Sequence, residues 1–463
     1  MAKESKSSNK AAMPILNILA IIVIILVVAA VGAYFYFGQK SSSLQNPKTP
    51  INTSTVVTSV TTTISTIVST SIIPAISTST TSISTPSRKS NDYIYISNIG
   101  NFSVGSGTIS VINSSTNKVI ATIPAGISAG QMIFIANSTY AFALTQSGVS
   151  GYHNISIINY TRNQFVKNVS LGRSSITAFE MAITPDGKSI YVIDTETCGA
   201  TINGQAINQP GIVQVVNIST YSITNITVGS CPEGVLFTPN GKYAYIPNLI
   251  SNSISVINIQ SRSIISTIQL NQPSGVLAVT SDGKTLYSIG NSSNYNVNSI
   301  LYMINATTGS VGRVATLGLI SQIIGINPTN KFMYIINYGS NSISIVNTSI
   351  NLIENSVSLP SGSSQMEFSP DGKTAYIFGY YSNYIFVMNT SSNKITSQIP
   401  IRGGAVAMNM TPDGKFIYVA IDNQTNSKAP GVVLAINATS EKISSTIPVG
   451  INPDYINAIE VHS

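Results

Sequence analysis

Few side chains in this sequence could carry chemistry, and four of them are aspartates that recur in one short phrase. The phrase reads T-P-D-G-K or a close variant, and its aspartates are Asp186, Asp282, Asp371 and Asp413. A ring of such carboxylates could bind a metal ion. The same phrase suits a tight turn, because Pro presets φ, Asp bonds to the local backbone and Gly adopts φ > 0. Because the aspartates recur at the same position of the same turn, we predict that they stabilise the turns and do not bind metal.

Three glutamates, Glu180, Glu233 and Glu367, lie near the starts of apolar segments and are the candidates for a charged site at the centre of the fold. The two histidines, His153 and His462, stand in no metal-ligand spacing. A phosphate-binding glycine loop is also missing from the sequence. With structural roles favoured for the glutamates, we predict that the chain is not an enzyme and binds no metal or cofactor.

These residues belong to a unit of about 45 residues that the chain repeats eight times. In each unit a turn leads to a strand, then to a strand that ends in Asn, such as Ile254–Asn258, and then to a further strand. Units of this length with four short strands are typical of propeller blades. We predict an all-β fold, an eight-bladed β-propeller of four-stranded antiparallel blades. Seven blades are the alternative, because the second unit is degenerate.

The two ends of the repeat region complement each other. The first unit lacks its innermost strand, while one strand, Tyr455–Val461, is left over at the C-terminus. We predict that this C-terminal strand completes blade one and closes the ring. Closure removes the open strand edges that favour aggregation.

The repeats resemble the YVTN family of β-propeller repeats, which is found in archaeal and bacterial surface proteins. The matching segments are Tyr95–Asn98 (Y-I-S-N), Tyr245–Asn248 (Y-I-P-N), Tyr334–Asn337 (Y-I-I-N) and Ile447–Gly450 (I-P-V-G). The resemblance spans residues 93–463. It implies the propeller architecture and a place at the cell surface, and it implies little about chemistry.

The segment before the repeats predicts a membrane anchor and a stalk. Residues 14–38 contain no charged residue and are long enough to cross about 30 Å of hydrocarbon as a helix. Lys3, Lys6 and Lys10 precede this segment, which places residues 1–13 in the cytoplasm. Residues 39–90 are rich in Ser and Thr and predict an extended, O-glycosylated linker. We therefore expect a single-pass protein of the cell membrane, with residues 91–463 forming an extracellular propeller.

Two other uses of the apolar segment are open. A cleaved signal peptide is disfavoured, because the apolar core is long and no A-x-A cleavage site follows it. The segment Lys10–Met13 resembles the processing site of archaeal pilin-like precursors. That resemblance would make the chain a pilin-like subunit of a surface filament.

The net charge of +7 does not belong to the propeller. Residues 91–463 hold 16 Lys or Arg and 15 Asp or Glu, whereas residues 1–90 hold 7 and 1. The basic character is therefore confined to the flanks of the apolar segment and the linker. Since the propeller shows no basic stripe, we expect no nucleic-acid partner.

Sixteen N-x-S/T sequons make an exported chain a candidate glycoprotein. Some sequons arise by chance in a sequence rich in Asn, Ser and Thr, and those at strand ends also suit turns. The predicted acceptors are Asn52 in the linker and, in the propeller, Asn101, Asn113, Asn137, Asn154, Asn159, Asn168, Asn217, Asn225, Asn291, Asn305, Asn347, Asn389, Asn409, Asn423 and Asn437.

The chain has two cysteines, Cys198 and Cys231. Strands in a blade alternate in direction, so the loops after the second and fourth strands emerge on one face, and both cysteines lie in such loops. An oxidising compartment then predicts a Cys198–Cys231 disulfide, with two free thiols as the alternative. The longest irregular loop, Thr195–Gly211, is on this face, which we predict to be the recognition surface.

A tyrosine cluster in blade seven is a further candidate for contact with a partner. Its members are Tyr380, Tyr381 and Tyr384. Edge packing is the favoured interpretation.

These features together predict an extracellular propeller, anchored in the membrane and displayed on a glycosylated stalk. We expect it to act in cell-envelope structure, adhesion or protein and glycan binding. Its expected partners are the membrane, through the N-terminal helix, envelope proteins or glycans, and further copies of itself. The alternatives are an exported lactonase-like hydrolase with a site at the central channel and a pilin-like filament subunit.

Overall fold

The computed structural model describes residues 91–100, 107–135, 138–146, 152–173, 178–194, 201–202, 205–206, 209–291, 296–327, 331–379, 382–422 and 429–461. The predicted cytoplasmic segment, membrane anchor and linker, residues 1–90, lie outside these ranges. Within the ranges, no helix is both long enough and apolar enough to cross a membrane.

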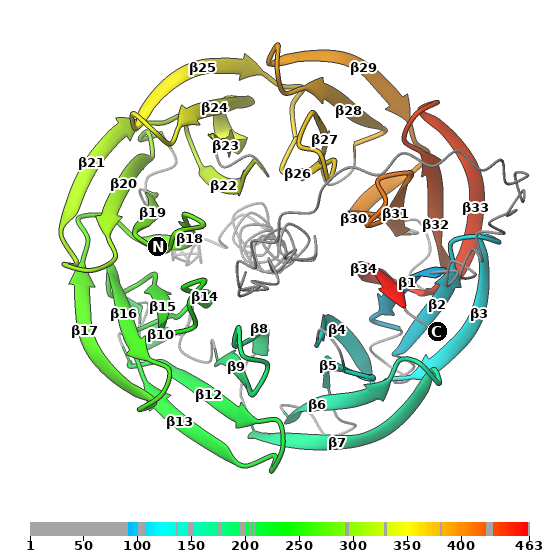
Figure 1. Cartoon of the computed structure of the whole chain (residues 1–463), viewed down its shortest axis with the longest axis horizontal. Helices are drawn as coiled ribbons and strands as arrows, with labels where there is room; N and C mark the ends of the chain where they lie inside the picture. The colour runs from blue at the N-terminus through cyan, green and yellow to red at the C-terminus, as the bar shows by residue number, and fades with distance from the viewer. Residues whose placement is uncertain are drawn as a thin grey trace, which may run out of the picture.

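The described chain is an all-β ring of eight four-stranded antiparallel blades (Figure 1). The prediction of eight blades is confirmed, and the seven-bladed alternative is wrong. Blade one has the strand order β3-β2-β1-β34, and the other blades use four strands that follow one another along the chain, apart from a small insertion in blade three.

Each blade presents its strands in the same order from the centre of the ring outward. The innermost strands are β34 (Pro453–Val461), β4 (Ser128–Phe134), β8 (Ala178–Ile183), β14 (Leu236–Phe237), β18 (Ser274–Val279), β22 (Ser321–Ile326), β26 (Gln365–Phe368) and β30 (Gly404–Met410). The second strands are β1 (Asn91–Asn98), β5 (Tyr140–Gln146), β9 (Ser189–Asp194), β15 (Tyr243–Asn248), β19 (Thr285–Gly290), β23 (Phe332–Asn337), β27 (Thr374–Phe378) and β31 (Phe416–Asp422).

The outer half of each blade repeats in the same way. The third strands are β2 (Thr108–Asn113), β6 (Tyr152–Asn159), β12 (Ile212–Asn217), β16 (Ser253–Asn258), β20 (Ile300–Asn305), β24 (Ser342–Asn347), β28 (Tyr384–Asn389) and β32 (Pro430–Asn437). The outermost strands are β3 (Lys118–Pro124), β7 (Gln164–Arg173), β13 (Ile223–Thr227), β17 (Ser263–Gln269), β21 (Val311–Thr316), β25 (Leu352–Ser358), β29 (Lys394–Pro400) and β33 (Lys442–Ile451). A hairpin of β10 (Thr201–Ile202) and β11 (Gln205–Ala206) lies in the blade-three insertion, and a 3-10 turn, η1 (Tyr338–Ser340), follows β23.

The ring closes through its two ends, as the sequence predicted. Strand β34 pairs antiparallel with β1, with Tyr93 opposite Ile459 and Tyr95 opposite Asn457. The C-terminal strand therefore supplies the innermost strand of blade one, beside β1, the first strand of the described residues (Figure 1).

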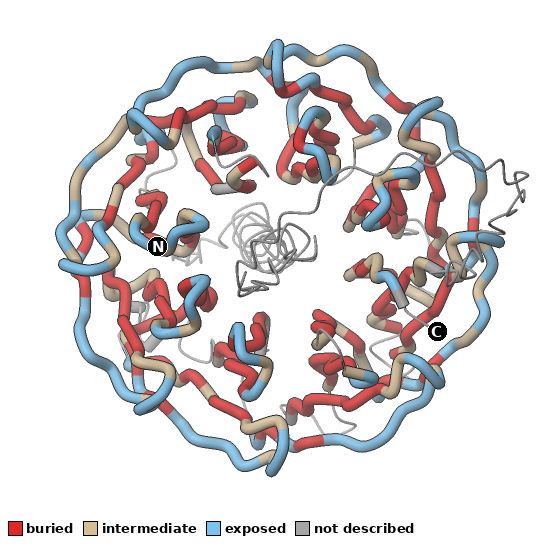
Figure 2. The backbone as a smooth tube through the Cα atoms, viewed as in Figure 1, coloured by how far each residue is buried: buried red, intermediate tan, exposed pale blue. Residues whose placement is uncertain are grey.

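The core lies between neighbouring blades, because each sheet packs face to face on the next. The second and third strands are buried on both faces, which explains why they read as apolar runs rather than alternating patterns (Figure 2). One core cluster shows the arrangement: Tyr245 and Val256 of blade four pack with Leu277 and Tyr302 of blade five.

A repeated tyrosine on the second strand fastens several blades to the next one. The Tyr418 hydroxyl donates to Asn117 Oδ1 at 2.6 Å, which joins blade eight to blade one. The Tyr287 hydroxyl of blade five likewise donates to Asn351 Oδ1 of blade six at 2.5 Å. Both asparagines stand in the turn between the third and outermost strands of the next blade, with φ near 50°. Asn suits that position, because it tolerates a left-handed backbone.

Blade three lacks this fastening. Tyr191 is buried, and its hydroxyl has no hydrogen-bond partner among the described residues. The equivalent left-handed position in blade four is Arg262, with φ 52°, and Arg has no acceptor to offer.

We expect Arg262→Asn to stabilise the ring by about 1 kcal/mol, because it gives the buried Tyr191 hydroxyl an acceptor and suits the positive φ. Urea denaturation measures the change. In a Tyr191→Phe background most of the gain should vanish, and an undiminished gain there would contradict the mechanism.

A second inter-blade contact explains why the repeat has an asparagine at the end of the second strand and a glycine near the end of the outermost strand. Asn98, Asn248 and Asn337 end second strands, are buried, and bond to serines on the adjacent third strand, as Asn248 Nδ2 does to Ser255 at 3.0 Å. A Cβ at Gly229 would lie 2.7 Å from Asn248 Cγ, and one at Gly450 would lie 2.6 Å from Asn98 Cγ. A glycine is required near the end of the outermost strand, at Gly229 and Gly450, because the asparagine of the next blade approaches its Cα.

Candidate functional site

The two faces of the ring differ in what they carry. One face, which we call the turn face, holds the turns between innermost and second strands and those between third and outermost strands. The opposite face, which we call the loop face, holds the connections after the second and the outermost strands. This division follows from the alternating strand direction in every blade.

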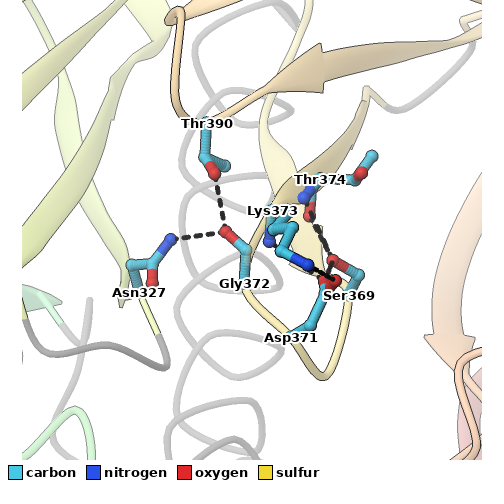
Figure 3. Close-up of polar contacts among 7 residues, drawn as sticks. All are labelled: Asn327, Ser369, Asp371, Gly372, Lys373, Thr374 and Thr390. Atoms are coloured by element: carbon cyan, nitrogen blue, oxygen red, sulfur yellow. Dashed lines mark hydrogen bonds and ion pairs between the residues drawn. The ribbon is translucent and has the colours of Figure 1, made fainter.

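The four repeated aspartates lie in the hairpins of the turn face, which confirms their predicted role. Asp371 Oδ1 accepts the Ser369 hydroxyl at 2.6 Å and the Lys373 N–H at 3.1 Å (Figure 3). The same two bonds recur at Asp186, Asp282 and Asp413. The backbone and hydroxyl bonds hold the pKa of Asp282 below its usual range, and the side-chain and backbone bonds lower the pKa of Asp371.

The Asp371 turn also touches the preceding blade. Asn327 Nδ2 of blade six donates to the Gly372 carbonyl at 2.8 Å, and the Thr390 hydroxyl donates to the same oxygen at 2.6 Å (Figure 3). The Asp371 turn is therefore part of the ring's framework. Among the described residues, no group of three or more His, Cys, Asp and Glu is arranged to hold a metal ion.

Two of the three candidate glutamates meet between blades three and four, near the loop face. Glu180 is 2% exposed and accepts the Val235 N–H, and its Oε2 would lie 2.9 Å from a Cβ at Gly234. Glu233, the residue before Gly234, is 9% exposed, and its Oε1 lies 3.2 Å from Cys231 Sγ. The structure therefore brings Glu180 and Glu233 together.

Both carboxyls of this pair are held towards the protonated form. Burial raises the pKa of Glu233 to about 7. Burial also raises the pKa of Glu180 well above its usual range, and the charge of Glu233 adds to the effect. Two adjacent carboxyls that retain a proton near neutral pH can exchange that proton, which is the property that acid–base chemistry uses.

Glu367 lies apart from this pair, in blade seven. Burial raises its pKa to about 8, and it accepts the Met410 N–H of blade eight. Gln131 Oε1 likewise accepts the Met181 N–H of blade three at 2.7 Å, and Asn409 Oδ1 accepts the Ala458 N–H of blade one at 3.2 Å. These side chains cap N–H groups on the innermost strand of the next blade. The role explains a polar residue in an otherwise apolar strand.

The loop face holds two further titratable groups that the sequence did not single out as a pair. His153 is buried at the start of β6, and Asp194 ends β9 in the next blade. Burial lowers the pKa of His153, and the charge of Asp194 opposes that effect.

A second acidic pair, Asp422 and Asp454, lies where blades eight and one meet. Burial raises the pKa of Asp454 to about 6, and the charge of Asp422 contributes. The sequence did contain a signal for it. Asn452-Pro453-Asp454 repeats the pattern of Cys231-Pro232-Glu233, and Asn452 and Cys231 both have positive φ.

The predicted disulfide depends on a residue outside the described ranges, Cys198. Its partner Cys231 is buried at the loop face, with φ 56°. The disulfide stays a prediction.

The predicted glycan acceptors occupy three kinds of position. Asn52, Asn101, Asn137 and Asn423 lie outside the described residues. Asn154 is buried and Asn168, Asn291 and Asn409 accept hydrogen bonds from neighbouring groups, while Asn225 is exposed on β13. The remaining acceptors end third strands at the turn face: Asn113, Asn159, Asn217, Asn305, Asn347, Asn389 and Asn437.

In the tyrosine cluster, Tyr380 and Tyr381 lie outside the described residues. Tyr384 is 40% exposed at the start of β28, and its ring centroid is 6.3 Å from that of Phe386. The contact-cluster interpretation stays a prediction.

Comparison with known proteins supports the fold. No protein-family model and no curated protein matches the sequence. Among solved structures, the chain is similar to the dihydro-heme d1 dehydrogenase NirN in complex with DHE, with TM-score 0.60 and 12% identity over 79% of this chain and 75% of that one. It is also similar to apo AztD from Citrobacter koseri, with TM-score 0.54 and 15% identity over 80% and 98%. At these identities the likeness shows the fold alone.

The prediction that the chain is not an enzyme is corrected by this likeness: a similar fold occurs in a dehydrogenase, so the fold gives no ground for excluding catalysis. Burial raises the pKa of Glu180, Glu233 and Glu367, which were predicted to have structural roles, and that of Asp454, which the sequence did not single out.

Proposed function

We propose that this chain is a YVTN-type surface propeller, anchored in the membrane, that binds a cell-envelope glycan or protein at its loop face. One observation carries the proposal. The turn face repeats nearly the same hydrogen-bonded hairpin around the ring, whereas the loop face holds the groups that depart from the repeat, including His153, Asp194 and Asp422. A binding site on a repeat scaffold is expected where the repeats differ.

The point at which the chain enters the ring supports the orientation. Strand β1 begins at Asn91, which pairs with Val461 at the turn face. The preceding residues therefore join the ring on the turn face. An N-terminal anchor at residues 14–38 would therefore be tethered to the turn face, and the loop face would lie on the side of the ring opposite the tether.

A matched set of tyrosines tests the proposal. Tyr338 and Tyr384 are exposed on the loop face, at 36% and 40%, while Tyr140 is 42% exposed on the turn face. Full-length protein in detergent micelles is measured by interferometry against envelope polysaccharide and envelope protein isolated from the producing cells. We expect Tyr338→Ala or Tyr384→Ala to weaken binding about tenfold, a typical loss for an aromatic contact.

The Tyr140→Ala control should bind as the unmodified protein does. Equal loss in all three variants, or loss only in Tyr140→Ala, would place the binding surface elsewhere and overturn the proposal.

An exported hydrolase, lactonase-like in architecture, is the second candidate. It is favoured by the adjacent buried carboxyls of Glu180 and Glu233, which resemble an acid–base pair in their environment. Lactone hydrolysis that is abolished in Glu233→Gln, and kept in Tyr338→Ala, would favour this candidate over the binding protein.

A further inference from the structure

All eight third strands end in an asparagine that shapes the next turn. Each of these asparagines accepts, at Oδ1, a backbone N–H two or three residues further on, at 2.8 to 3.1 Å. They are Asn113, Asn159, Asn217, Asn258, Asn305, Asn347, Asn389 and Asn437. The asparagine itself is thus explained by the turn.

The hydroxyl residue that follows the asparagine is not explained by the turn. Seven of the eight turns carry Ser or Thr two residues after the asparagine, and blade four carries Gln260 instead. Blade four nevertheless forms the same turn, with Ser261 N donating to Asn258 Oδ1 at 2.9 Å. Five of the hydroxyls make no hydrogen bond to any described residue: those of Ser219, Thr307, Ser349, Ser391 and Thr439.

We propose that the turn-face rim of the ring is a set of six N-glycan acceptors, Asn113, Asn159, Asn217, Asn305, Asn389 and Asn437, selected from the many sequons of this chain. In all six, the turn holds Oδ1, and Nδ2 makes no hydrogen bond to a described residue. The hydroxyl two residues on is the recognition element that a glycosylating enzyme reads.

The modification itself is a transfer from a lipid-linked oligosaccharide. The Nδ2 nitrogen forms a bond to the sugar's C1, the bond from C1 to the phosphate oxygen breaks, and the amide gives up one proton. The lipid phosphate or diphosphate is the leaving group. This chemistry requires a free Nδ2, which excludes Asn347, because its Nδ2 donates to Glu354 Oε1 at 2.5 Å and the residue is 8% exposed.

Exposed apolar side chains beside the acceptors support the same inference. The outermost strands begin just after the rim turns and expose Ile120, Phe165, Val311 and Ile443, at 40% to 48%. Each follows its rim asparagine by six or seven residues. A glycan on the rim would cover apolar surface that otherwise faces water at the unpaired edge of each blade.

Glycopeptide mass spectrometry of the full-length protein from its producing cells tests the inference. We expect sugar on the six rim asparagines and none on Asn347, Asn154 or Asn409. Thr439→Ala should remove the sugar from Asn437 with its melting temperature unchanged, whereas Asn437→Ala should also lower the melting temperature. Gln260→Ser, made in the same cells, should add a glycan at Asn258.

Unmodified rim sites, modification of Asn347 and Asn409 at the same occupancy as the rim, or no added glycan in a folded Gln260→Ser protein would each overturn the inference. It shares with the proposed function only the export of the ring. Protease treatment of intact cells tests export separately, and ligand binding at the loop face is read by a different assay, so the two can fail independently.

Discussion

The ring should be most stable in mild acid, near about pH 4–5, and its melting temperature should fall as the pH rises through 6 to 8. Burial raises the pKa of Glu233 from an ordinary 4.5 to about 7 and that of Glu367 to about 8, while Asp92 and Asp454 reach about 6. A carboxyl with a raised folded-state pKa contributes stability that is fully present below its unfolded pKa. That stability is lost as the pH rises through the folded value.

Other groups set the acid side of this optimum. The turn aspartates Asp186, Asp282, Asp371 and Asp413 have lowered pKa values, so their contribution is lost as the pH falls below the ordinary 3.8. His153 opposes the buried carboxyls: burial lowers its pKa, so its contribution is present above the ordinary 6.5 and is lost as the pH falls through the lowered value. For Glu233 alone the neutral-pH cost is on the order of 3 kcal/mol.

Glutamine variants isolate the buried pair. Glu233→Gln and Glu180→Gln remove the titrating proton, and Gln131 already fills the place equivalent to Glu180 in the preceding blade. We expect thermal unfolding of both variants to lose part of its pH dependence between about 4.5 and 7, while the part that Glu367 contributes up to about pH 8 remains. Glu354→Gln on the exposed face of β25 is the control and should keep it. A flat profile in the unmodified protein would contradict the assignment.

Removal of β34 should destabilise the ring more than any single substitution in its blades. Truncation after Asn452 leaves β1 with an unpaired inner edge along its whole length and removes Ile456 from the core. We expect the truncated protein to lose its cooperative thermal transition and to aggregate, because an open edge of apolar strand pairs with other chains. Calorimetry and light scattering measure both effects.

The control for this truncation is removal of His462 and Ser463 alone, which leaves β34 intact. That variant should melt as the full chain does. A synthetic peptide of residues 453–461, added to the longer truncation, should restore part of the transition. An unchanged melting temperature after loss of β34 would show that the closing strand contributes little.

The sequence predicted the features that repeat and missed those that depend on how blades face one another. The eight units, the closing strand and the turn role of Asp371 all follow from patterns within one blade. The meeting of Glu180 with Glu233, and of Asp422 with Asp454, depends on side chains from neighbouring blades, whose relative register no single repeat encodes. The orphaned Tyr191 hydroxyl is of the same kind, because its cause, Arg262, stands in the next blade.

The pairing of β1 with β34 also determines when the protein can finish folding. The first strand of the ring is made first, and the strand that completes its blade is made last. At about 5–20 residues per second, synthesis from Asn91 to Val461 takes roughly 20 to 70 s. Throughout that interval blade one is a three-stranded sheet with a bare edge. Assembly can therefore proceed blade by blade, but the ring closes only once the whole chain has been delivered.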